Sequence, residues 1–288
     1  MPETTTCMAA ETLAAETTAA ETTAVDTQSY YHHLGGNSYS STIHAQGAWN
    51  AHEQHMAPVT GIMVHALEQF QPRNDMRLVR LNFDILGLIP AGDFSIETTL
   101  LRPGKTIELL QAELMAGGRV AVRATAWRLQ RGDTSAVEAL EDKALEPLEQ
   151  AVPWTGLNSW PGGFIKTIEG RSLPGHRKGH GRAWLHSPYT MLDGGEHSSA
   201  LVRLLGLADS ANGVAARVTP EPGSFMFPNV DLSLHIYREP VGEWLGLDST
   251  VTFAGDGVGL TSSVLHDAQG PFGRSEQILT LRPIPHSQ

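Results

Sequence analysis

Hydrophobic residues follow a helical pattern twice along the chain, once in each half. Apolar side chains recur at spacings of three and four over residues 59–70, and the same spacing returns over residues 201–208. Because residues three and four apart lie on one face of a helix, each stretch predicts an amphipathic helix with one apolar stripe. The Asn-Gly pair at 212–213 predicts a left-handed glycine cap that ends the second helix.

Strict alternation of apolar and polar residues predicts the strands that follow each helix. Residues 79–85 and 230–236 alternate in this way, which is typical of a strand with one buried face. The segments 117–118 and 267–270 have the composition of hairpin turns. Further strands are expected over residues 94–101, 106–115, 119–129, 247–253, 259–266 and 273–282.

The two halves of the chain look like copies of one unit. Pro90 corresponds to Pro240 and Leu129 to Leu279, each pair being 150 residues apart. An offset of this size indicates two related domains rather than a solenoid. Each copy reads as a central helix wrapped by antiparallel strands, an arrangement that buries both apolar faces. Two such units could continue one sheet across the pair and so cover an edge strand on each.

Two segments fall outside this repeat. The N-terminal tail is rich in Ala, Glu and Thr and repeats AAET, so it offers little to bury and is expected to be disordered. Between the halves, residues 136–150 predict an acidic helix, followed by a Trp-, Pro- and Gly-rich stretch. The expected organisation is a tail at 1–28, a first unit at 29–130, a connector packed on the body at 131–180 and a second unit at 181–288.

Composition narrows the class of protein. The 288 residues carry a formal net charge of −11, which argues against general nucleic-acid binding. The single cysteine, Cys7, cannot form an internal disulfide, which favours a cytoplasmic protein. No apolar run approaches the roughly 20 residues that span a bilayer, so no membrane partner is expected.

Both halves carry short motifs in the same order and at similar spacing. Those in the first half are Gly47-Ala-Trp49, His55-Met-Ala-Pro-Val-Thr-Gly61, Arg80-Leu-Asn-Phe-Asp84 and Arg102-Pro-Gly-Lys-Thr106, and those in the second are Phe227 to Pro240, Gly242-Glu-Trp-Leu245, Asp267-Ala-Gln-Gly270 and Gln277. Together they resemble acyl-CoA thioesterases of the double-hotdog type, the relatives of bacterial acyl-CoA thioesterase II. The resemblance implies an α+β fold with two tandem antiparallel sheets, each wrapped round a long helix. It also implies a hydrolase that cleaves an acyl thioester of coenzyme A or of an acyl carrier protein.

The same resemblance implies a catalytic trio of an Asp, a hydroxyl residue and a Gln in the second half. The matching residues are Asp231, Thr252 and Gln277. Asp231 would take a proton from the attacking water, while the other two would hold that water by hydrogen bonds. The corresponding first-half positions carry no such trio, which predicts one active centre per chain; they are Arg80, Arg102 and Trp127.

An oxyanion would form during thioester hydrolysis, and a helix N-terminus is suited to stabilise it. The candidate helix openings lie near Thr60-Gly61 and near Gly194-Gly195. A covalent route through Asp231 is also open.

Other residues are candidates for contact with the substrate or for support of the fold. His55 and His235 could line the pocket, and Arg177 with Lys178 could meet coenzyme A phosphates within a locally basic run. Asp209 matches a family Asp at the end of the second helix, for which a structural role is expected.

Alternative functions remain open from the sequence alone. The matching helix opening reads Val59-Thr60-Gly61 rather than the family's Gly-Gly-Gln, which leaves room for a cyclase, dehydratase or release enzyme of polyketide-like metabolism. A non-catalytic acyl-binding protein is a further alternative. Some histidine pairs, such as His52 with His55, have spacings that suggest metal ligands, but no cysteine accompanies them and no H-E-x-x-H motif is present, so no metal or cofactor is expected. Exposed sheet edges make a homodimer plausible.

Overall fold

The computed structural model describes residues 28–194 and 198–286, so the expected disorder of residues 1–27 and the role of Gly195 lie outside the described part. Its helices are α1 (Met56–Gln69), α2 (Ala200–Ala208) and the short α3 (Ala211–Val214). The strands are β1 (Ser29–Gly35), β2 (Ser38–Ser41), β3 (Met76–Ile85), β4 (Asp93–Arg102), β5 (Ile107–Ala116), β6 (Arg119–Gln130), β7 (Val152–Pro153), β8 (Glu169–Ser172), β9 (His180–His186), β10 (Thr190–Leu192), β11 (Phe225–Met226), β12 (Asp231–Ile236), β13 (Leu245–Phe253), β14 (Val258–Asp267), β15 (Gly270–Thr280) and β16 (Arg282–Pro283).

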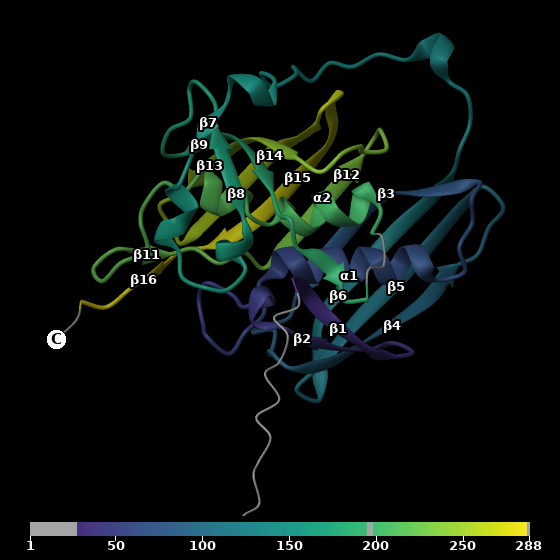
Figure 1. The fold of residues 1–288 in the computed structure, drawn as a ribbon, viewed down its shortest axis with the longest axis horizontal. Helices are drawn as coiled ribbons and strands as arrows, with labels where there is room; N and C mark the ends of the chain where they lie inside the picture. Colours follow the sequence, from purple (N-terminus) through teal and green to yellow (C-terminus); the bar gives the residue numbers. More distant parts are fainter. Residues whose placement is uncertain (1–27, 195–197, 287–288) are drawn as a thin grey trace, which may run out of the picture.

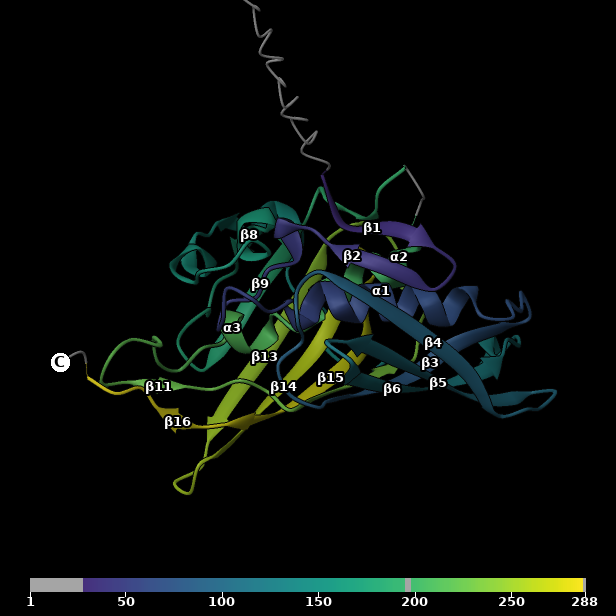
Figure 2. The ribbon, with the colours of Figure 1, turned by 90° about the horizontal axis from the view of Figure 1, so that it is seen from below.

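The two units share one long curved sheet, as the sequence predicts. Its strand order is β10-β1-β2-β4-β5-β6-β3-β12-β15-β14-β13-β9-β8-β7, so the halves meet where β3 pairs with β12. This junction is antiparallel, with Asp231 opposite Asp84 and His235 opposite Arg80. Both long helices lie on the concave side of the sheet (Figure 1). Figure 2 shows the first half curling round α1, with β1 and β2 on one side and β3 to β6 on the other.

The two central helices pack side by side and run in opposite directions. Gly61 of α1 faces Gly206 of α2 so closely that a β-carbon on Gly61 would lie 3.2 Å from the Gly206 Cα. The start of α1 therefore lies beside the end of α2, and Glu68 near the end of α1 accepts a hydrogen bond from Ser199 at the start of α2. Because α1 is covered by the sheet and by α2, it is buried nearly all round rather than along one stripe.

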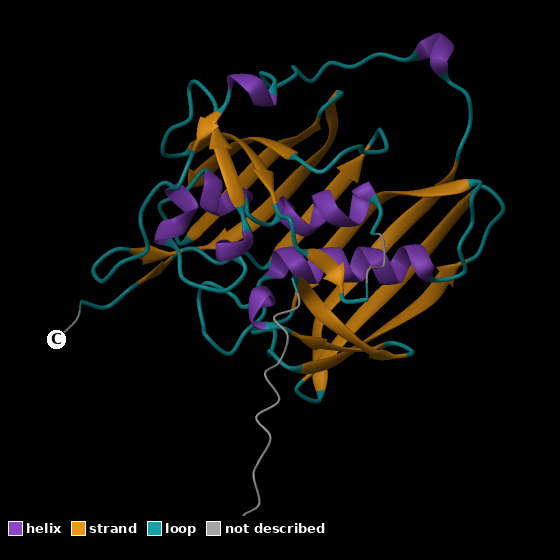
Figure 3. Ribbon diagram, viewed as in Figure 1, coloured by secondary structure: helices purple, strands orange, loops and turns teal. Residues whose placement is uncertain are grey.

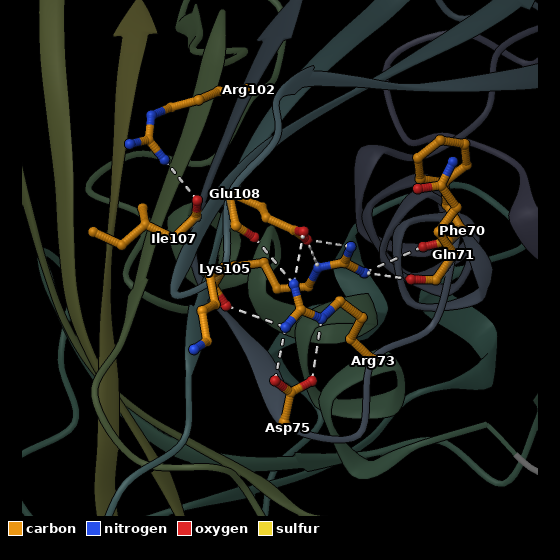
Figure 4. A network of polar contacts seen from close by, with 10 residues as sticks. Phe70, Gln71, Arg73, Asp75, Arg102, Lys105, Ile107 and Glu108 are labelled. Atoms are coloured by element: carbon orange, nitrogen blue, oxygen red, sulfur yellow. Dashed lines mark hydrogen bonds and ion pairs between the residues drawn. The ribbon is translucent and has the colours of Figure 1, made fainter.

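A buried ion-pair network fixes the end of α1 that lies beside the start of α2 (Figure 4). Arg128 donates to the Phe70 and Gln71 carbonyl oxygens at 3.2 and 3.1 Å, and to Glu108 Oε2 through its Nε at 2.8 Å. Arg73 holds the other Glu108 oxygen at 2.9 Å. Burial would raise the pKa of Glu108, but the hydrogen bonds and charges of these two arginines outweigh it and hold that pKa below its usual value.

The connector differs from the expected acidic helix. Between β6 and β7 the chain forms an extended loop with only two short 3-10 turns, Ser135–Val137 and Leu148–Gln150 (Figure 3). Val137 and Leu140 are exposed, so no apolar stripe is present to hold a helix against the body. Further along the connector, Phe164 is fully buried in the main core.

The predicted end of the second helix is also wrong. The chain turns at Asp209 and then continues into α3, so Asn212 and Gly213 lie within a helical turn rather than at a left-handed cap. The φ angle of Gly213 is not positive, as a left-handed cap would require. This early end of α2 leaves Asp209 at the junction between two helices, directly beside the start of α1.

Candidate active site

A cavity of about 310 Å³ lies where the start of α1 meets the end of α2. Both halves of the sheet and the connector contribute to its walls. Its ionisable lining residues within the described ranges are Glu53, His55, Asp209 and Arg282. Its larger apolar lining residues are Trp49, Met56, Ile85, Leu88, Ile89, Leu157, Trp160, Ile165 and Val230.

Asp209 is the buried carboxylate of this cavity, with 4% of its surface exposed. Its Oδ1 accepts hydrogen bonds from Asn229 Nδ2 at 2.7 Å and from Gln277 Nε2 at 2.8 Å. Burial raises the pKa of Asp209, and these two hydrogen bonds only partly offset it, so the pKa reaches about 6. Its Oδ2 accepts no hydrogen bond from any described residue. Because this oxygen is not fully enclosed by protein, it opens on the cavity.

His55 lines the cavity next to Asp209, at the N-cap of α1. Its backbone N–H donates to the Ala45 carbonyl oxygen at 2.8 Å, which anchors the chain just before the helix. Its ring packs on Phe164 of the connector, with ring centroids 4.4 Å apart. The His55 Nδ1 lies 3.7 Å from Asp209 Oδ2, so the helix start and the buried carboxylate face each other.

The predicted catalytic trio is not brought together. Gln277 is fully buried on the concave face of β15 and contacts Asp209. On β12 the buried residues are Leu232, Leu234 and Ile236, so the Asp231 side chain lies on the convex face, where its Oδ1 accepts a hydrogen bond from the Ile278 amide at 2.7 Å. Thr252 is likewise exposed on the convex face of β13. The sheet therefore separates Asp231 and Thr252 from Gln277.

The helix openings also differ from those expected. α1 begins at Met56, so Thr60 and Gly61 lie in its second turn; the Thr60 hydroxyl donates to the Met56 carbonyl oxygen at 2.9 Å. Gly61 serves the close contact with α2. Gly194 lies in the turn after β10, and α2 begins only after its own N-cap, Ser199. Of the two predicted openings, the first is thus displaced by one turn and the second lies outside the helix.

The remaining predicted contact residues lie away from Asp209. His235 is exposed on the convex face, beneath the connector. Arg177 and Lys178 are exposed in the hairpin between β8 and β9 and border a second cavity of about 190 Å³. Trp160 and Gly213 line both that cavity and the Asp209 cavity, so the two are neighbours.

Comparison with known families decides the class of this protein. The N-terminal domain of acyl-CoA thioesterases matches residues 45–129, and the C-terminal domain matches residues 142–281. The chain belongs to the acyl-CoA thioesterase family. Its double-hotdog fold, predicted from the sequence, is thereby confirmed, as is its assignment to a family of hydrolases.

Solved structures share the thioesterase fold at low sequence identity. A candidate thioesterase from Novosphingobium aromaticivorans is 17% identical with a TM-score of 0.67, over 88% of this chain and 98% of that one. An acyl-CoA thioesterase II, TesB2, from Mycobacterium marinum is 15% identical with a TM-score of 0.60, over 88% and 96%. A hot dog fold protein of unknown function from Alicyclobacillus acidocaldarius is 13% identical with a TM-score of 0.66, over 87% and 95%. No curated protein sequence matches this chain.

The sequence reasoning missed the central place of Asp209 and the presence of Asn229. These residues come together only because a helix end, a loop and a strand converge: Asn229 and Gln277 lie 20 and 68 positions after Asp209 along the chain.

Within the described ranges, no group of three or more His, Cys, Asp or Glu side chains could hold a metal ion. Nor is any helix of those ranges long and apolar enough to cross a bilayer.

Proposed function

We propose that this acyl-CoA thioesterase family member hydrolyses its thioester in the Asp209 cavity, with Asp209 as the general base. The observation that carries the proposal is a buried carboxylate with one oxygen held by two neutral donors and the other open on an apolar cavity. A pKa raised to about 6 lies close enough to neutral pH for proton transfer in both directions.

The reaction proceeds in two steps. Asp209 Oδ2 takes a proton from a water molecule as the water oxygen attacks the thioester carbonyl carbon, forming a tetrahedral oxyanion. The oxyanion then collapses, the carbon–sulfur bond breaks, and the proton passes from Asp209 to the leaving sulfur. The products are a carboxylic acid and a free thiol, and Asp209 returns to its carboxylate form. The covalent route through Asp231 would instead form an anhydride on a side chain that lies on the convex face of the sheet, away from this cavity.

Two neighbours position the base. Gln277 and Asn229 each donate to Asp209 Oδ1, which fixes the plane of the carboxylate and leaves Oδ2 turned to the cavity. The start of α1 borders the cavity beside Asp209, where the helix dipole favours the negative charge that develops on the carbonyl oxygen. The oxyanion site expected at a helix opening is therefore assigned to the region of His55 and Met56.

The walls of the cavity suit an acyl group, and nearby cations suit coenzyme A. Trp49 and Trp160 meet edge to face with ring centroids 5.3 Å apart and present aromatic surface to the acyl chain. Arg177 and Lys178 border the neighbouring cavity and make no ion pair within the described ranges, so they are free to bind phosphate. Replacing both with Gln should raise KM several-fold for an acyl-CoA and leave KM for the matching N-acetylcysteamine thioester unchanged.

One observation favours a second candidate function. The pair of His55 and Asp209 resembles an acid–base pair that could remove a proton next to a carbonyl and eliminate water from a carrier-bound hydroxyacyl chain. Burial lowers the pKa of His55 to about 3, which makes this ring a poor base and argues for hydrolysis instead. Formation of an enoyl product from a 3-hydroxyacyl thioester, without release of thiol, would support the elimination.

The test is a hydrolysis screen over acyl-CoAs of different chain length and over aryl-CoAs, with released thiol as the readout. Wild-type protein should release thiol, and Asp209→Asn should lower kcat by about 10³-fold, within the range of lost general base catalysis. Asp231→Asn is the matched control, since it changes a carboxylate on the other face of the sheet. Ligand binding without thiol release would indicate an acyl-binding protein, and loss of activity in Asp231→Asn alone would restore the predicted trio.

A further inference from the structure

The His55 ring has a defined tautomer because of its position at the start of α1. Its Nδ1 accepts a hydrogen bond from the Ala57 N–H at 3.1 Å, as the N-cap of the helix. A ring nitrogen that accepts a hydrogen bond carries no proton, so the proton of a neutral ring lies on Nε2. Burial lowers the pKa of His55 to about 3, and the ring is therefore neutral at physiological pH.

The His55 ring borders the cavity, and its Nε2–H is unused by the described residues. Within the described ranges Nε2 makes no hydrogen bond, and it is not fully enclosed by protein. His55 lines the same cavity as Asp209, and its side chain keeps 14% of its surface exposed. The cavity thus presents one open acceptor, Asp209 Oδ2, and one open donor, His55 Nε2–H.

The first turn of α1 offers few other donors. The Ala57 N–H is already bound by His55, and Pro58 has no N–H. Val59 N–H bonds to the His55 carbonyl oxygen at 3.4 Å, which leaves Met56 N–H as the only amide of this turn without a partner among the described residues. An oxyanion at this helix start therefore needs a second donor from a side chain.

We propose that neutral His55 donates its Nε2–H to the thioester carbonyl oxygen and stabilises the oxyanion together with the Met56 amide. This role rests on the proposed hydrolysis at Asp209. His55 gives up no proton in either step, because the proton of the attacking water travels through Asp209 to the leaving sulfur. A neutral ring also suits its neighbour, since an imidazolium 3.7 Å from Asp209 would lower the pKa of that carboxylate and weaken the base.

The decisive variant is His55→Asn. Asparagine is a good N-cap, so it keeps the start of α1, but its shorter side chain has no N–H at the position of His55 Nε2. We expect kcat to fall by about 100-fold, as when an oxyanion donor is removed, with KM and the pH dependence set by Asp209 unchanged. Tm should fall modestly, because the packing of the ring on Phe164 is lost. Ser199→Ala is the matched control: it removes the N-cap of α2, which accepts from Val202 N–H at 3.1 Å, and should lower Tm while leaving kcat unchanged.

Nitrogen-15 NMR of the His55 ring measures its protonation state and its tautomer independently of activity. The proposal predicts a neutral ring with its proton on Nε2 at pH 7. An imidazolium, a proton on Nδ1, or full activity of His55→Asn beside an inactive Asp209→Asn would overturn the role of His55 alone. Activity that survives Asp209→Asn would instead refute the proposed hydrolysis at Asp209, and the role of His55 with it.

Discussion

The two ends of the antiparallel helix pair each bury a carboxylate, with opposite consequences. At the end of α2, Asp209 has only neutral neighbours, and burial raises its pKa to about 6. At the end of α1, Glu108 is held between Arg128 and Arg73, and its pKa lies below the usual value. Burial disfavours the charged form at both ends, so the presence of cations decides which carboxylate is a stable ion and which can exchange a proton. Under the proposed function, the end at Glu108 is structural and the end at Asp209 is reactive.

Breaking the buried pair at the structural end should cost the most stability. Glu108→Gln leaves Arg128 buried without its counter-charge, and loss of one partner of such a pair typically costs about 3–5 kcal/mol. Asp209→Asn removes a carboxylate that is costly to ionise, so its free energy of unfolding at pH 7 should equal or exceed that of the wild type. Urea unfolding of the two variants measures both, and equal destabilisation would show that the ends do not differ.

The two carboxylates should also give stability opposite pH dependences. A raised pKa contributes stability that is present below the unfolded-state pKa and lost as pH rises through the folded-state pKa, so the contribution of Asp209 falls between about pH 4 and 6. From a pKa of 3.8 to about 6, this loss is roughly 3 kcal/mol. The lowered pKa of Glu108 contributes stability above about pH 4.5 that is lost in acid. Unfolding of the wild type, Asp209→Asn and Glu108→Gln from about pH 2.5 to 7 separates the two trends, since the Glu108 contribution is lost only below about pH 4.5; parallel curves would contradict them.

Removing one hydrogen-bond donor from Asp209 should widen the difference between its pKa and that of Glu108. Gln277→Leu deletes a hydrogen bond to the ionised form of Asp209, worth about 1.5 kcal/mol for a charged acceptor. The pKa of Asp209 should rise by about one unit, and the acid limb of the kcat/KM profile should move up with it. An unmoved limb with lower kcat would mean that Gln277 acts on the water or the substrate rather than on Asp209.

The smallest effect is expected on the convex face of the sheet. Thr252→Ala changes an exposed strand residue far from both helix ends, so kcat and KM should stay within about twofold of the wild type, the scale of surface substitutions. A loss of turnover comparable to that of Asp209→Asn would place the reactive centre on the convex face instead.

Much of the fold could be predicted from the sequence because periodicity reports which face of an element is buried. The strands over 79–85 and 230–236, both long helices and the hairpin at 117–118 are confirmed. The acidic stretch at 136–150 is not the expected helix: Val137 and Leu140 are exposed while Leu145 is buried, so its apolar residues do not share one buried face.

The reactive site was harder to predict, for two physical reasons. The alternation of residues 230–236 already places Leu232 and Leu234 inside, so the parity of the strand puts Asp231 outside, although its motif suggested a catalytic role. The contact of Asp209 with Gln277 depends on where α2 ends and on how the two helices cross. Local sequence patterns predict neither of these features. The sequence therefore pointed to Gln277 as a candidate, while Asp209, the carboxylate that it binds, was expected to have only a structural role.

The central claim, that Asp209 is the base of this thioesterase, is tested most directly by the pH dependence of hydrolysis. For the wild type, kcat/KM should fall below an apparent pKa of about 6, since protonated Asp209 cannot accept a proton. The Asp209→Asn variant should show a small residual rate without that limb. A limb near pH 6 that persists in Asp209→Asn, at a rate close to the wild type, would contradict the account.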